Sequence, residues 1–150
     1  MRKNSTLWLL LGTALLPVAA AAGLYFSGLA GELRHQSNRG ELVLPVKTLA
    51  EWGGNKADHT GKWTLLLTPA PGCDASCQTE QLESLRAVHN ALGRNAGRVR
   101  VALKATAPAM PGTGVWLVDP LGNLVLHYPQ AAPRDTLHDL RRLLRLSGIG

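Results

Sequence analysis

The chain begins with one long apolar run and then changes to short segments in which apolar and polar residues alternate. No charged residue occurs from Asn4 to Gly31, a stretch longer than the roughly 20 apolar residues that cross a bilayer as a helix. Trp8 and Tyr25 stand near its two ends, as interfacial aromatic residues do. The pattern predicts a transmembrane anchor over residues 1–31 and a polar tether over residues 32–41.

A cleaved signal peptide is the alternative interpretation of this segment, because the alanines at 19–22 resemble a cleavage site. The apolar run continues past them through Phe26, which favours an uncleaved anchor. Both interpretations place the remainder beyond the membrane, with Arg2 and Lys3 on the inner side. We therefore expect a cytoplasmic (inner) membrane protein whose soluble domain faces the periplasm or outer side.

Residues 42–150 show the periodicities of one α/β domain. A short apolar run at 42–44 precedes a short helix and turn at 47–57. Apolar runs predict strands at 62–68, 99–103, 115–118 and 124–128, and helical spacing predicts helices at 78–95 and 133–146. The turn residues at 119–123 join the last two strands into a hairpin. A parallel strand–helix–strand unit followed by a hairpin and a helix is the thioredoxin-like (βαβ + ββα) arrangement.

Two cysteines carry the most informative chemistry in the chain. Cys73 and Cys77 follow the first of these strands and open the next helix, with Ser76 as the expected N-cap. A helix N-terminus lowers a thiol pKa, and the spacing allows a disulfide or joint ligation of a soft metal ion. A purely structural disulfide would close a very small loop, which constrains the unfolded chain little. We expect Cys73 to attack and Cys77 to resolve a mixed disulfide.

The cysteine turn and the hairpin resemble the Sco/SenC family. The resemblance lies in residues 61–67 leading into the Cys-x-x-x-Cys motif, and in residues 115–124. It implies a membrane-anchored thioredoxin-like protein of cytochrome c oxidase assembly, whose partner is an oxidase subunit or assembly factor. The chain departs from the family at Gln78, where a proline is usual. It also lacks, within 109–114, the histidine that is the family's third copper ligand.

Copper(I) favours soft sulfur ligands, and two other residues are candidates for the third ligand. Met110 precedes the third strand and His127 lies near the end of the fourth, both at the expected cysteine end of the sheet. Three hypotheses stay open. The protein is a thiol–disulfide oxidoreductase acting on a partner, or a copper(I) carrier using Cys73 and Cys77 with Met110 or His127, or a non-catalytic assembly scaffold with a structural disulfide.

Charge does not point to another class of function. The net charge of +6 comes from 16 basic and 10 acidic residues, but no aromatic residues interleave with the basic ones as they do in single-strand binders. The basic residues of the last helix are better explained as a solvated face near anionic lipid headgroups. Residues 112–114 are too few for a phosphate-binding loop and precede a strand, so we expect neither nucleic acid nor nucleotide as a partner.

Overall fold

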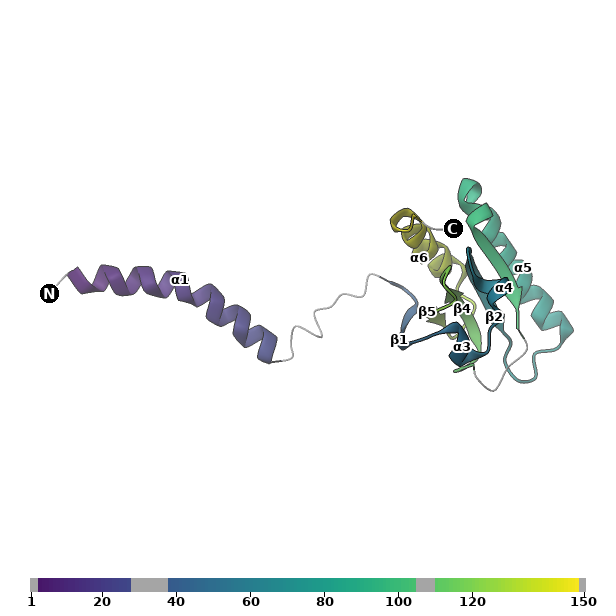
Figure 1. The fold of residues 1–150 in the computed structure, drawn as a ribbon, viewed down its shortest axis with the longest axis horizontal. Helices are drawn as coiled ribbons and strands as arrows, with labels where there is room; N and C mark the ends of the chain where they lie inside the picture. The colour runs from purple at the N-terminus through teal and green to yellow at the C-terminus, as the bar shows by residue number, and fades with distance from the viewer. Residues whose placement is uncertain (1–2, 28–37, 105–109, 149–150) are drawn as a thin grey trace. The chain divides into compact units, whose positions relative to one another are not determined.

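The computed structural model describes residues 3–27, 38–104 and 110–148, with side chains from Trp8 onward, and its chain divides into two units, Met1–Ser37 and Asn38–Gly150. The elements, drawn in Figure 1, are α1 (Lys3–Phe26), β1 (Glu41–Lys47), α3 (Leu49–Trp52), α4 (Lys56–His59), β2 (Trp63–Thr68), α5 (Ala75–Ala91), the 3-10 helix η1 (Gly93–Arg98), β3 (Val99–Leu103), β4 (Gly114–Val118), β5 (Leu124–Tyr128) and α6 (Pro133–Leu146). Residues 32–37 of the expected tether lie outside the described residues, and 38–41 belong to the second unit.

The first unit contains the apolar helix α1. Its segment Trp8–Phe26 is, within the described parts of the chain, the one helix long and apolar enough to cross a membrane, and none of that segment is buried inside the protein. Pro17 lies within the helix, a position that membrane helices tolerate. The helix therefore suggests a single-pass membrane anchor.

The second unit is built on a five-stranded sheet in the order β1-β5-β4-β2-β3. β2 and β3 run parallel and are joined through α5, whereas β4 pairs antiparallel with both β2 and β5. The parallel pair needs a crossover connection, and α5 supplies it. The predicted βαβ and ββα halves are thus both present, and the domain is an α/β domain with a thioredoxin-like fold.

The edge strand β1 was not predicted as a strand. The sequence indicated only a short apolar run at Leu42–Leu44, but the strand spans Glu41–Lys47 and pairs antiparallel with β5. Pro45 lies within it, after a cis peptide bond, where the pairing register is irregular. Proline removes a backbone donor and is therefore tolerated in a sheet at an edge such as this one. The helix expected over 47–57 is divided into α3 and α4.

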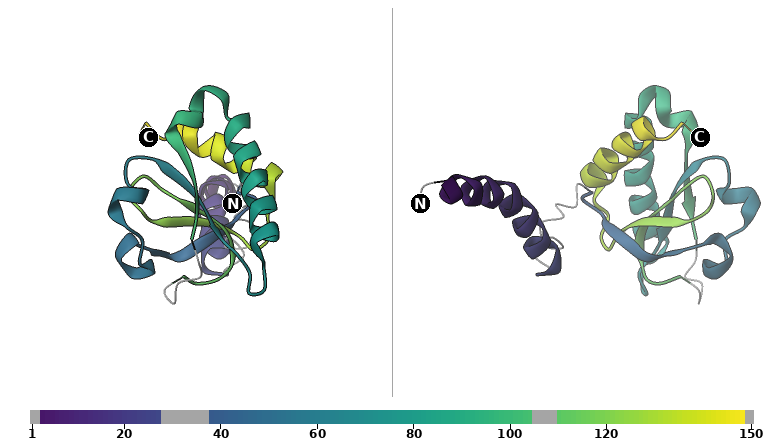
Figure 2. Two further views of the ribbon diagram at one scale, coloured as in Figure 1. Left: turned by 90° about the vertical axis from the view of Figure 1, so that its right-hand side faces the viewer. Right: turned by 60° about the vertical axis from the view of Figure 1, so that its left-hand side comes forward.

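The two faces of the sheet bury different sets of residues. One face packs against α5 and α6, and its central cluster includes Leu65, Leu67, Val115, Leu117, Leu126, Leu85, Val88, Leu140 and Leu144. The opposite face packs against α3, and its cluster comprises Trp52, Leu66, Met110, Trp116, Val118 and Leu124. Figure 2 shows α5 and α6 together on one side of the sheet, with the α3–α4 segment on the other. Alternation along β2 and β4 produces this division, because successive strand residues point to opposite faces.

A buried carboxylate joins the start of this unit to its last helix. Asp139 is 1% exposed, and its Oδ2 accepts hydrogen bonds from the backbone N–H of Arg39 at 2.8 Å, from that of Gly40 at 2.9 Å and from the Tyr128 hydroxyl at 2.9 Å. Burial acts to raise the pKa of Asp139, but hydrogen bonds from Gly40, His138 and Tyr128 outweigh it and hold that pKa below its ordinary value. Asp139 is therefore a charged acceptor that fixes the entry of the chain into the domain.

Candidate functional site

The cysteine turn begins where the fully buried strand β2 ends. The chain leaves Thr68, and Gly72 then adopts a φ of 84°, a left-handed conformation that favours glycine. The N–H of Cys73 donates to the carbonyl oxygen of Ala70 at 3.0 Å, which closes the turn. Cys73 and Cys77 form a disulfide with their Cα atoms 5.4 Å apart. The structure thus brings the two predicted sulfur atoms together at the start of α5.

The N-cap of α5 is Asp74, and the prediction of Ser76 was wrong. The Asp74 Oδ1 accepts the backbone N–H of Cys77 at 2.9 Å and the hydroxyl of Ser76 at 2.8 Å. Both residue types are good caps, so sequence alone did not fix the start of the helix, which begins at Ala75 and not at residue 78. Because Asp74 is the N-cap, a carboxylate lies at the start of the helix, between the two cysteines in the sequence.

This carboxylate opposes the effect of the helix N-terminus on the thiols. The hydrogen bond from the Cys77 N–H, with that from the Ser76 hydroxyl, lowers the pKa of Asp74, so the group is ionised at neutral pH. Its negative charge disfavours a neighbouring thiolate, whereas the unpaired N–H groups of a helix N-terminus favour one. Gln78, in place of the proline usual in the Sco/SenC family, donates through Nε2 to the Cys73 carbonyl at 3.0 Å and fixes the turn from within the helix.

A cavity of about 250 Å³ adjoins the cysteine turn. It lies between the end of β2, the first turns of α5, the start of β4 and the residues after β5, and it includes Thr68, Ala70, Gln81 and Gly114 in its lining. The Thr68 Oγ1 and the Gln81 Oε1 are buried there and have no hydrogen-bond partner among the described residues. Cys73 and Cys77 are themselves half-buried.

Met110, a candidate copper ligand, lies away from the cysteine helix. Its side chain is 7% exposed and packs in the apolar cluster that contains Trp52, Leu66 and Trp116. That cluster occupies the face of the sheet opposite α5. A thioether in such surroundings fills space in a core, as methionine often does.

His127, the other candidate, lies on the same opposite face. Its ring stacks on Trp116 with the ring centroids 3.8 Å apart, and its Nε2 donates to the carbonyl oxygen of Thr113 at 2.8 Å. Its Nδ1 lies 3.6 Å from Glu41 Oε2. Within residues 3–27, 38–104 and 110–148 there is no group of three or more His, Cys, Asp or Glu side chains arranged to hold a metal ion. Copper binding by Cys73 and Cys77 stays a prediction, and the structure brings neither Met110 nor His127 to them.

Comparison with known proteins agrees with the fold, but the matched residues do not include the cysteine turn. Residues 102–147 match the family model described as "Transmembrane-like, thioredoxin-like, C-terminal domain". The match covers less than half of the chain, from the end of β3 through the hairpin to α6. A search of the curated proteins and a search of the solved structures found no match. The match supports a thioredoxin-like protein of membrane type, and a disulfide-bonded pair in such a domain is consistent with thiol redox chemistry.

Some residues of this region could not be recognised from the sequence. Thr68 ends an apolar strand and Gln81 follows the cysteines by one helical turn, but only the fold shows that both line one cavity. His59 lies buried against Trp52 with ring centroids 4.8 Å apart. The alternation of Arg100, Ala102 and Lys104, along β3 and into the residue after it, was a usable signal, because it places two cations on the face that His59 covers.

Proposed function

We propose that this protein is a membrane-anchored thiol–disulfide exchange protein, with its domain in the periplasm or on the outer side of the cytoplasmic membrane. The observation that carries the proposal is the half-buried disulfide between Cys73 and Cys77 at the start of α5. Disulfides persist outside the cytoplasm, and a pair that closes so small a loop contributes little as a structural link. The apolar helix α1 is consistent with this location.

The exchange follows from the positions of the two sulfur atoms. In the reduced protein the Cys73 thiolate attacks one sulfur of a partner disulfide, forms a mixed disulfide and expels one partner thiolate. The Cys77 thiol then loses its proton to solvent, and its thiolate attacks the Cys73 sulfur. This step re-forms the Cys73–Cys77 disulfide and releases the second partner thiolate. Two electrons pass to the partner, and a dithiol reductant must return two electrons to the oxidised protein before the next cycle.

The resemblance to Sco/SenC extends the proposal to its substrate. We propose a copper-site cysteine pair of a cytochrome c oxidase subunit, or an assembly factor that serves it, as the partner whose disulfide is reduced. The cavity of about 250 Å³ beside the turn supports a protein substrate, because it offers space next to the disulfide for part of a partner chain.

Trapping of the mixed disulfide tests the proposal. The full chain in detergent micelles is reduced, freed of reductant and mixed with the oxidised soluble domain of an oxidase copper subunit. We expect the Cys77→Ser variant to accumulate a covalent complex with the subunit, because no resolving thiol remains, and a reductant should cleave that complex. Cys73→Ser is the matched control and should trap little. If neither variant forms a complex and the wild type does not reduce the disulfide of the subunit to free thiols, the oxidase assignment is wrong.

A further inference from the structure

A second cavity lies on the face of the sheet opposite the cysteine helix. It measures about 430 Å³ and is bounded by the α3–α4 segment on one side and by the edge strand β3 on the other. Asp58 and His59 of the α3–α4 segment line it, together with Arg100 and Lys104 from β3 and the residue after it. Nothing in the proposed thiol chemistry uses these residues.

Two cations reach this cavity from the same face of β3. The guanidinium of Arg100 donates to the carbonyl oxygen of Asp58, and the Lys104 Nζ donates to that of Gly53 at 2.7 Å. The Lys104 Nζ also lies 4.6 Å from the centre of the Trp52 ring. Each contact uses one N–H, whereas a guanidinium has five and an ammonium has three. Both groups therefore retain donors for a further acceptor, while their existing contacts hold them in place.

A buried histidine completes the lining. His59 is 5% exposed, and its Nδ1 has no hydrogen-bond partner among the described residues. Burial lowers the pKa of His59. Asp58 acts to raise this pKa, and Lys104 and Arg100 act to lower it further. The ring is thus neutral at physiological pH. A buried polar atom without a partner costs free energy, so this nitrogen is available to a ligand that reaches it.

We propose that this cavity is a binding site for a small oxyanion, a phosphate or carboxylate group held by Arg100, Lys104 and His59. Two fixed cations against one lining carboxylate, Asp58, make the site attractive to negative charge. A bound anion would offset the repulsion that Lys104 and Arg100 exert on an imidazolium. Binding would therefore be coupled to proton uptake by His59, so that the ring becomes a third charged donor.

The test uses the full chain in micelles of a neutral detergent, with sulfate and acetate as separate probes of phosphate-like and carboxylate-like chemistry. Sulfate keeps its charge across the range of about pH 5 to 8 in which an imidazole titrates. Binding is followed by calorimetry and by the NMR shifts of the His59 ring. We expect saturable binding of at least one probe, with the His59 pKa raised in the complex. Affinity should be highest at low pH and fall as pH rises through the bound-state pKa.

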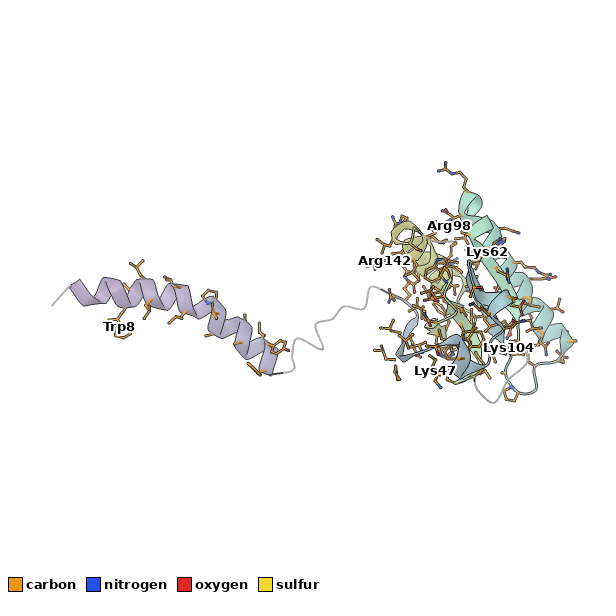
Figure 3. The ribbon with its side chains drawn as sticks, viewed as in Figure 1. Trp8, Lys47, Lys62, Arg98, Lys104 and Arg142 are labelled. Carbon is orange, nitrogen blue, oxygen red and sulfur yellow. A yellow bond between two sulfur atoms is a disulfide. The ribbon has the colours of Figure 1, made fainter. Side chains whose placement is uncertain are left out.

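Three variants separate binding from folding. Lys104→Met should weaken binding about tenfold or more, the loss expected for a charged hydrogen bond. Lys62→Met is the matched control at the opposite end of the sheet, as Figure 3 shows, and should bind as the wild type does. His59→Gln should bind without the pH dependence. Absence of saturable binding of both probes to the folded wild type would overturn the proposal, as would equal effects of the two lysine variants. The cysteine chemistry would be unaffected by either result.

Discussion

Replacement of Asp139 gives the sharpest prediction for stability, because one buried carboxylate accepts hydrogen bonds from two distant parts of the chain. In Asp139→Ala the backbone N–H of Gly40 and the hydroxyl of Tyr128, both buried, lose their acceptor. The N–H of Arg39 is only partly buried, so water can replace the carboxylate there. The substitution should therefore leave two buried donors without a hydrogen-bond acceptor.

The magnitude follows from those two donors. A buried donor left without an acceptor costs about 1–3 kcal/mol, and effects within one network are not additive. We expect Asp139→Ala to lower the free energy of unfolding by about 3–4 kcal/mol, a large part of the roughly 5–15 kcal/mol of a typical domain. Tyr128→Phe removes one donor and leaves the carboxylate with its others, so it should cost only about 1 kcal/mol.

Urea unfolding of the full chain in detergent micelles measures these changes, with the fluorescence of the buried Trp52, Trp63 and Trp116 as the signal. The control is Asp135→Asn, one turn earlier on α6, because Asp135 bonds the Arg39 guanidinium at 2.9 Å on the surface. An exposed pair contributes little, so this change should cost at most about 0.5 kcal/mol. A loss below about 1 kcal/mol for Asp139→Ala, or equal losses for Asp139→Ala and Asp135→Asn, would refute the reasoning.

The same network predicts a pH dependence with a definite sign. The folded-state pKa of Asp139 lies below its unfolded value of about 3.9, so the folded carboxylate holds its proton less tightly. Its contribution is therefore complete above the unfolded pKa and is lost as pH falls through the folded pKa. Unfolding curves in acid should show a smaller decline for Asp139→Asn than for the wild type. An identical decline would contradict this assignment.

Three further predictions concern the cysteine end of the domain. Asp74→Asn keeps a good N-cap and removes a negative charge, so the thiol pKa of reduced Cys73 should fall; the pH dependence of alkylation measures it, and an unchanged or higher pKa would contradict the electrostatic argument. Cys73→Ser should abolish copper(I) binding by the reduced protein, as measured by competition with a chelator, whereas Met110→Leu and His127→Gln should leave the affinity unchanged, because these two side chains lie on the other face. A weaker copper affinity in either variant would show that the replaced residue is a ligand. Gly114→Ala should cost about 2–3 kcal/mol, since φ is 118° and a Cβ would collide with the Tyr128 carbonyl oxygen; a neutral effect in urea would show that the backbone yields.

Much of the secondary structure follows from the sequence because local periodicity specifies it. The predicted bounds of β3, β5 and α6 agree with the structure residue for residue, since each is an uninterrupted apolar or amphipathic run. β1 was missed because Pro45 interrupts a short run, and its strand conformation depends on pairing with β5, which is distant in the chain. The early end of α5 at Ala91, followed by η1, reflects Gly93 with its φ of 57°.

The candidate site was predictable only in part, for a physical reason. Cys73 and Cys77 are near neighbours in sequence, so helical geometry alone places them together. A third ligand has to come from another strand, and which face of the sheet a residue occupies depends on register. Met110 and His127 lie at the expected level of the sheet but on the wrong face for the cysteine helix. The contacts of Asp139 with Arg39 and Gly40 join residues about a hundred positions apart, and no local pattern reports them.

The most direct test of the central claim is an equilibrium redox titration of the full chain in micelles, against thiol buffers of known potential. The fraction of Cys73 and Cys77 that reacts with an alkylating reagent is read by mass spectrometry at each potential. We predict one two-electron transition between about −120 and −270 mV, the range spanned by exchange-active protein dithiols. A pair that stays oxidised throughout this range would be a static disulfide and would contradict a function in thiol–disulfide exchange.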